Sequence, residues 1–440
     1  MGGMTAIAGE LGVPQSRLLG GITAGVVTAM LIAPRGSWVY LIVLSAVLFA
    51  ALFQAGWRFN QTARPTAAGT ALLGFGVLAL LSAAWAVVPA AAVRSGFACL
   101  LEAGLAIIAT DCAARLPEAA VRSVGKGMLA GFAIGMAFLL FEGVTGLFLH
   151  KLVFNAFPSF KPGNDQDYSI EAGKIVGIGG YMLKRNTSEA ALLLWPLLLL
   201  AQRLSPARLV APAIIAIAGS CALGAYLSNH DSSFLAMVIS AGAFALASLA
   251  FSAGWWTVAA SWCAVNLLVV PVMLWEFQAR LYQLPWLQFS AQARLVIWGY
   301  TAEQVLKAPV LGIGAGSGGV LFGRQTSFDM APGSHQPLTT ANHQHDIFLQ
   351  AWYELGGIGA VALCAVGLVA LWRLKRLPGP VRAYALAAFA AGMGMVSTSY
   401  GLWQEWFEAS IALSAIALVT AIRLTSPGAF ELGQFRCAEN

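Results

Sequence analysis

Long uninterrupted apolar runs dominate this chain and restrict what it can fold into. Of its 440 residues 59% are hydrophobic and only 10% are charged, whereas soluble domains carry about 25% charged residues. The runs are close to the roughly 20 residues that a helix needs to cross a bilayer, and none alternates at the period of a β-strand. We therefore predict an all-α polytopic membrane protein, with residues 1–440 forming a single transmembrane domain.

Twelve runs qualify as transmembrane helices, and two polar segments interrupt their otherwise short connections. A smaller segment, 150–186, follows the fifth run, and a larger one, 275–345, follows the ninth. The predicted spans are 18–34, 37–55, 67–88, 93–112, 125–149, 187–202, 207–227, 232–252, 254–274, 346–371, 380–400 and 403–422.

The distribution of Lys and Arg predicts the orientation, because short cytoplasmic loops are rich in them. Short loops on the second side contain only Arg35 and Arg94, whereas the first side contains Arg58, Arg64, Arg115, Arg122, Lys126, Arg203, Arg208, Arg373, Lys375, Arg376 and Arg382. Both termini should then be cytoplasmic, and both polar segments should face outward. In a Gram-negative cell this describes an inner-membrane protein with periplasmic loops. The net charge of +6 fits a membrane surface better than nucleic acid.

The larger polar segment should be partly helical and should lie on the membrane as an outer lid. Residues Leu281–Leu287 and Leu295–Val310 carry enough apolar surface for this. The stretch Gly312–Gly323 contains six glycines and predicts a tight or mobile turn. A nucleotide phosphate cradle is disfavoured there, because no strand precedes the glycines and no Walker lysine follows them.

His345 is the strongest candidate for chemistry. It precedes an apolar helix and shares a helical spacing with Leu349, Trp352 and Gly356, which predicts a position at the mouth of that helix. A histidine there could act as a general base near neutral pH. It could equally be an interfacial residue that caps the helix.

Metal binding is a weaker alternative, and we expect no metal and no cofactor. His343 and His345 with Asp346 could bind a metal only if this segment is extended, because residues i and i+2 point apart on a helix. Asp165 and Asp167 form a D-x-D pattern, but the neighbouring residues predict a solvated turn.

Several cations lie in the outer segments, against the expected distribution of positive charge. They are Lys184, Arg185, Arg280 and Arg294. Arginine binds phosphate oxygens bidentately and stays protonated, so these residues are candidates for binding a diphosphate. The alternative is that their side chains only extend to the membrane interface.

The pattern around His345 resembles the signature of the O-antigen ligase family. His345-Asp346 is followed after nine residues by Gly356 and after two more by Gly359. Asp346 departs from the signature, which has an amide or hydroxyl residue there. A carboxylate beside His345 is expected to favour the imidazolium form.

Three arginines match further elements of the same family. Arg280 fits an Arg-x-x-x-Leu motif literally, but Arg294 is the preferred match because a P-x-x-G-x-G run, Pro309–Gly314, follows it. Arg185 corresponds to an arginine that opens the span after the smaller outer loop.

The resemblance implies an O-antigen ligase of lipopolysaccharide biosynthesis. Such an enzyme transfers a glycan from undecaprenyl diphosphate to a sugar hydroxyl of lipid A–core, without a metal and with inversion. His345 would be the base, and Arg185, Arg294, Arg280 and Lys184 would bind the donor diphosphate. His343 and Asp346 are secondary candidates. The expected partners are the donor, the acceptor and membrane lipids.

Two alternatives stay open. The first is an O-antigen polymerase or a protein O-oligosaccharyltransferase of the same superfamily, which shares the donor and the histidine-bearing loop. The second is a lipid or solute transporter. It is disfavoured because the chain shows no two halves with matching hydropathy or paired Gly/Pro-broken spans.

Overall fold

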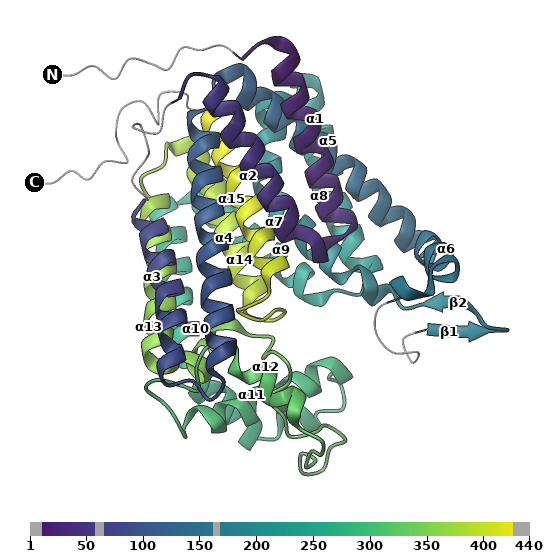
Figure 1. The fold of residues 1–440 in the computed structure, drawn as a ribbon, viewed down its shortest axis with the longest axis vertical. Helices are drawn as coiled ribbons and strands as arrows, with labels where there is room; N and C mark the ends of the chain where they lie inside the picture. Colours follow the sequence, from purple (N-terminus) through teal and green to yellow (C-terminus); the bar gives the residue numbers. More distant parts are fainter. Residues whose placement is uncertain (1–10, 58–65, 162–167, 426–440) are drawn as a thin grey trace, which may run out of the picture.

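The computed structural model describes residues 11–57, 66–161 and 168–425. Long helices run side by side in one bundle, and shorter elements gather at one end of it (Figure 1). The long helices are α1 (Val13–Ile32), α2 (Ser37–Gln54), α3 (Ala67–Leu81), α4 (Pro89–Arg115), α5 (Glu118–Val144), α7 (Lys184–Leu204), α8 (Ala207–Leu227), α9 (Asp231–Leu249), α10 (Phe251–Gln278), α13 (Ile347–Leu374), α14 (Gly379–Val396) and α15 (Glu405–Thr425).

Each predicted span corresponds to one of these helices, and the chain is a polytopic α-helical membrane protein. Ten of the described helices are long and apolar enough to cross a membrane. The other two long helices, α7 and α14, do not meet that criterion, so the number twelve stays a prediction. Helix α7 can carry polar residues because it is enclosed: every residue from Asn186 to Ala201 is buried.

Two large apolar clusters form the interior. One joins α1, α2, α5 and α8, and the other joins α3, α9, α10 and α13; α4, α7, α14 and α15 contribute to both. The closest pairs of helices include α1 with α5 and α9 with α14. Helix α7 packs against α15, α8 and α14, so its first turn is held on several sides.

The end of the bundle opposite the start of α1 and the end of α15 carries the larger outer segment (Figure 1). This segment contains the short 3-10 helix η7 (Leu281–Gln283), helix α11 (Phe289–Val305) and helix α12 (Ser317–Arg324). Two expectations were wrong here. Leu281–Leu287 forms only one 3-10 turn, and the second half of the glycine-rich stretch is α12 rather than a turn.

The smaller outer segment contains the only strands of the described residues. Helix α6 (Phe148–Ala156) and the 3-10 helix η4 (Pro158–Phe160) precede an antiparallel hairpin of β1 (Tyr168–Glu171) and β2 (Lys174–Ile178). Helix α6 and the hairpin project sideways from the bundle (Figure 1). The hairpin was missed because two strands of four and five residues leave little periodicity to detect.

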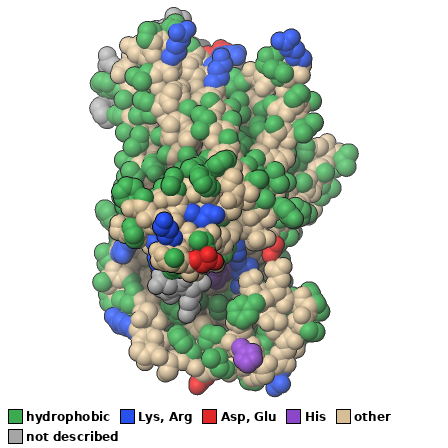
Figure 2. All heavy atoms as spheres, turned by 90° about the vertical axis from the view of Figure 1, so that its right-hand side faces the viewer, with side chains coloured by type: hydrophobic (Ala, Val, Ile, Leu, Met, Phe, Trp, Pro, Cys, Tyr) green, Lys and Arg blue, Asp and Glu red, His purple; other side chains and the backbone are tan. Residues whose placement is uncertain are grey.

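Charge and apolar surface divide as a membrane protein requires. Apolar side chains are spread over the upper half of the face in Figure 2, where Lys and Arg lie at its upper end. Further Lys and Arg side chains surround a hollow in the lower half of this face (Figure 2).

Candidate active site

Helix α7 places two cations at the end of the bundle that carries the outer segments. Lys184 and Arg185 are its first two residues, not residues that precede it as the sequence suggested. The next turn is fixed by polar contacts to other helices. The Asn186 amide donates to the carbonyl of Leu31 over 2.7 Å, and the Glu189 carboxylate accepts from Ser410 over 2.9 Å. These bonds hold the start of α7, and with it Arg185, against its neighbours.

His345 lies in the loop before α13 and not on the helix, which corrects the predicted helical face. Its φ of 57° places it in the left-handed region, an unfavourable conformation for a residue with a Cβ that occurs often at functional sites. Its Nδ1 lies 2.8 Å from the carbonyl oxygen of Ser399. Because a carbonyl only accepts, Nδ1 carries the proton and Nε2 presents a lone pair.

Burial lowers the pKa of His345, and the positive charges of Arg294 and Lys184 lower it further, while the Ser399 carbonyl raises it. The imidazole is therefore held neutral near pH 7. A neutral ring with a free Nε2 lone pair is the form that accepts a proton.

Asp346 caps α13 and does not face His345. One of its carboxylate oxygens accepts from the backbone N–H groups of Phe348 and Leu349, over 2.8 and 2.9 Å. The pKa of His345 is lowered overall, so a rise caused by this carboxylate does not dominate its titration. Burial instead raises the pKa of Asp346 itself to about 7, against the lowering effect of its two backbone bonds. Asp and Asn are both strong N-cap residues. Asp346 therefore keeps the capping role that an amide residue of the family signature would have at this position.

Arg294 reaches the same site from α11. One turn later on this helix, the Trp298 indole donates to the carbonyl of Gln344 over 2.7 Å. This bond fastens α11 to the segment that carries His343 and His345. Burial lowers the pKa of Arg294, but arginine stays protonated in proteins.

Lys184, Arg185 and Arg294, here called the basic cluster, therefore meet at the paired histidines. Arg185 lies with its guanidinium 5.7 Å from the Trp406 ring centre. Positive charge from Arg185 and Arg294 reaches His343, whose pKa burial lowers to about 3, and the rings of His343 and His345 are 4.2 Å apart. The positive charges of Arg185 and Arg294 also act on the hydroxyl group of Tyr400.

His230, Ser399 and Tyr400 support the site, and sequence reasoning assigned none of them a role. His230 hydrogen-bonds Ser233 over 2.6 Å and Ser399 over 3.2 Å, so it steadies the residue that orients His345. Burial lowers the pKa of His230 to about 3. Tyr400 bonds the hydroxyl of Ser188 over 2.7 Å. The predicted span 380–400 hid these contacts, because α14 ends at Val396 and Ser399 and Tyr400 lie in the turn beyond it.

Arg280 and the metal candidates are arranged differently. Arg280 has an exposed side chain and a positive φ of 56° at the start of η7, and the structure does not bring it to the basic cluster. Within the described parts of the chain, no three His, Cys, Asp or Glu side chains are grouped to hold a metal ion. Asp165 and Asp167 lie outside the described residues.

The motif glycines form one junction between the outer segment and α13. Gly356 has φ 63° and ψ −163°, which breaks α13 in a conformation open almost only to glycine. At the break, Gly357 donates to the carbonyl of Pro309 over 2.8 Å. Gly312 also has a positive φ, and a Cβ there would lie 2.5 Å from the backbone of Glu354. The two glycine motifs thus fit each other and fix the outer segment beside the histidines.

The fold and site define a polytopic helical membrane protein with a basic, histidine-bearing site at one end. Residues 214–364 match the family model described as O-antigen ligase, which confirms the resemblance over that part of the chain. The match contains Arg294, His345 and the glycine junction, but not Arg185 or Tyr400. A Rickettsia conorii protein provisionally named as a polysaccharide ligase is 30% identical over 125 residues. That region spans 28% of this chain and 30% of the relative.

Proposed function

We propose that this protein is an O-antigen ligase that transfers a glycan from undecaprenyl diphosphate to a sugar hydroxyl of lipid A–core. The observation that carries the proposal is the state of His345: Nδ1 is bound to the Ser399 carbonyl, Nε2 is left as an acceptor, and the positive charge of Arg294 acts on the ring. The family match over residues 214–364 supports the substrate class. In a Gram-negative cell the site would face the periplasm from the inner membrane.

The reaction follows from this arrangement. The acceptor hydroxyl oxygen attacks the anomeric carbon, and the bond from that carbon to the diphosphate oxygen breaks. The hydroxyl proton passes to Nε2 of His345, and the electron pair leaves on the diphosphate. Direct attack inverts the anomeric carbon.

The basic cluster would stabilise the leaving group. Charge accumulates on the diphosphate as the bond breaks, and fixed cations are most effective where charge develops. Arg185 and Arg294 can each hold phosphate oxygens bidentately, and Lys184 adds a third positive charge. The Ser399 carbonyl would stabilise the imidazolium that forms on His345.

The test is complementation of a Gram-negative host that lacks its own ligase. His345→Ala is expected to abolish O-antigen-capped lipopolysaccharide while core-only lipopolysaccharide persists. His335→Ala is the matched control, because His335 is an exposed histidine in the same outer segment. Normal capping by a well-expressed His345→Ala protein would refute the proposed base.

A membrane assay separates the ligase from related activities. Lipid A–core, growing O-antigen and an acceptor protein are offered separately with the same donor. Transfer only to growing O-antigen would indicate a polymerase, and transfer only to protein would indicate an oligosaccharyltransferase; either result would contradict the proposal. If the protein instead moved lipid across the membrane, and His345→Ala left that transport unchanged, the result would indicate a transporter.

A further inference from the structure

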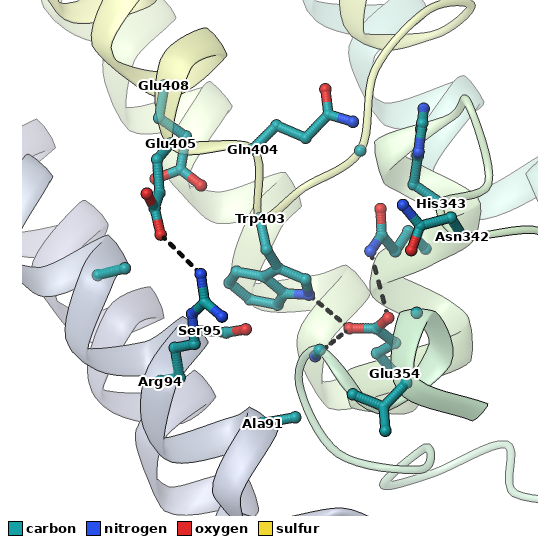
Figure 3. A pocket seen from close by; sticks show the side chains of 16 residues that line it. Ala91, Arg94, Ser95, Asn342, His343, Glu354, Trp403, Gln404, Glu405 and Glu408 are labelled. Carbon is teal, nitrogen blue, oxygen red and sulfur yellow. Dashed lines mark hydrogen bonds and ion pairs between the residues drawn. The ribbon is translucent and has the colours of Figure 1, made fainter. Parts of the chain in front are cut away.

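A second polar space adjoins the histidines, outside the basic cluster. It has a volume of about 350 Å³, within the roughly 300–1,000 Å³ of small-molecule pockets. Its walls come from the start of α4, from α12, from α13 and from the turn before α15 (Figure 3). His343 and the neighbouring Asn342 also line it. We call this space the acidic pocket, because Glu354, Glu405 and Glu408 line it and Arg94 is the single Lys or Arg among the described residues of its lining.

Glu354 lines one wall of the pocket, and both of its carboxylate oxygens accept hydrogen bonds from neighbouring groups. It is 0% exposed. One of its oxygens accepts from the Trp403 indole N–H and from the backbone N–H of Gly316, and the other accepts from the amide of Gln350 over 3.2 Å. These bonds fix the Trp403 ring in the wall (Figure 3), so an aromatic surface is held ready for a ligand.

Other polar groups in the pocket are free to bind a ligand. The Glu405 carboxylate has only a 3.7 Å ion pair with Arg94, and the two side chains are 40% and 83% exposed, so the pair can rearrange at little cost. The side-chain oxygen of Gln404 and Nδ1 of His343 are buried without a hydrogen-bond partner in the structure. A buried polar atom without a partner is costly, and a ligand that donates to it would recover that cost.

The chemistry of this lining points to a sugar. Carboxylate and amide oxygens accept from hydroxyl groups, and an indole ring packs against the apolar face of a sugar ring, since it offers a large flat apolar surface. The charge restricts the sugar further. Glu405 and Glu408 would repel a phosphate or carboxylate. Glu102 behind them hydrogen-bonds Glu408, so these two carboxyl groups share a proton and carry at most one negative charge between them.

We propose that the acidic pocket binds a saccharide unit that carries neither phosphate nor carboxylate, and that this unit belongs to the acceptor. The assignment of this saccharide to the acceptor rests on the proposed function. The diphosphate of the donor belongs in the basic cluster, and His343 adjoins both regions. An acceptor sugar in the acidic pocket therefore lies next to the paired histidines, where a hydroxyl can reach His345.

The test is saturation-transfer NMR on the full-length protein in lipid nanodiscs without donor. The probes are methyl glucoside, methyl glucosaminide and methyl glucuronide, which share a ring and differ in charge. We expect signals from the first two and an at least fivefold weaker signal from the glucuronide, since like charges at close range in water cost a factor of about that size. Equal signals from glucoside and glucuronide would overturn the proposal.

Two variants with matched controls assign the signal to this pocket. Glu405→Lys should raise the glucuronide signal relative to the glucoside signal, whereas Glu303→Lys, at an exposed position on α11, should not. Trp403→Phe should weaken the glucoside signal, whereas Trp286→Phe, 75% exposed in the outer segment, should not. If Trp403→Phe fails to fold, Glu405→Lys alone decides. An unchanged ratio of the glucuronide signal to the glucoside signal in Glu405→Lys would overturn the proposal.

Failure of this inference and failure of the proposed function can be told apart. Binding is measured without donor, and transfer is measured separately. Selective sugar binding without any transfer to lipid A–core would contradict only the proposed function. Transfer by a protein that binds all three probes equally would contradict only the acidic pocket.

Discussion

The basic cluster and the acidic pocket are neighbours with opposite charge. Arg185 and Arg294 converge on His343 from α7 and α11, and Glu354 and Glu405, from α13 and α15, line a pocket that the same histidine also lines. No ion pair joins the two regions among the described residues. Such a separation would suit the two substrates that we propose, with the anionic donor group on one side and the uncharged sugar on the other.

The difference also shows how each region is held. The basic cluster depends on tertiary contacts, such as the Trp298 indole to the Gln344 carbonyl. The acidic pocket depends on Glu354, which sits two residues before the break in α13. Variants in the two regions should therefore have different consequences.

The largest effect is expected from the basic side. Arg294→Ala removes a cation from the developing charge of the leaving group, and loss of one such stabilising group costs about 10²–10³-fold in rate. Transfer to lipid A–core should fall by that amount while sugar-probe binding in the acidic pocket is retained. Arg280→Ala is the control, since Arg280 is exposed and outside the cluster. An equal loss in Arg280→Ala would assign the Arg-x-x-x-Leu motif to that residue instead.

Gly356 tests whether the two regions share one support. Gly356→Ala forces a Cβ against the backbone of Val310 at a positive φ, and such strain costs about 1–3 kcal/mol. The thermal unfolding midpoint should fall, and transfer and probe binding should fall together. Gly392→Ala is the control, because a Cβ there meets nothing within 4 Å. Loss of only one of the two activities would show that the regions are supported independently.

The sequence predicted the bundle and the convergence of three site residues better than it predicted the acidic pocket. The apolar runs specify helices by length and composition alone, and Arg185, Arg294 and His345 were singled out by charge, titration and resemblance. Glu354 and Glu405 lie within or at the end of apolar helices, and only tertiary packing shows that they face one space. His230 and Tyr400 were missed for the same reason: their roles are hydrogen bonds between segments far apart in the chain.

Variants of Asp346 test a smaller effect: whether its carboxylate shifts the pKa of His345 or only caps α13. Asp346→Ala should destabilise the protein by about 1 kcal/mol, the usual cost of losing an N-cap, whereas Asp346→Asn should keep most of the stability. Thermal unfolding of both variants measures this. A pH–rate profile displaced in Asp346→Asn, with unchanged stability, would instead show that Asp346 acts on His345.

The smallest expected effect is a shift in the pH dependence of transfer. His345 must be neutral to accept a proton, and its pKa is lowered from about 6.5 by burial and by nearby cations. Activity should therefore persist below pH 6.5 and fall only as the pH drops through this lowered pKa. A bound diphosphate would neutralise Arg294 and Lys184 and so raise the pKa of His345 in the complex.

The pH dependence of kcat reports the complex, and that of kcat/KM reports the free enzyme. The acid limb of kcat should then lie at higher pH than the acid limb of kcat/KM for the donor. Arg294→Gln should narrow this gap, because it removes a charge that the donor would otherwise neutralise. Glu405→Gln should leave the gap unchanged if the two regions act separately. A gap of the opposite sign in the unmodified protein would contradict diphosphate binding beside His345.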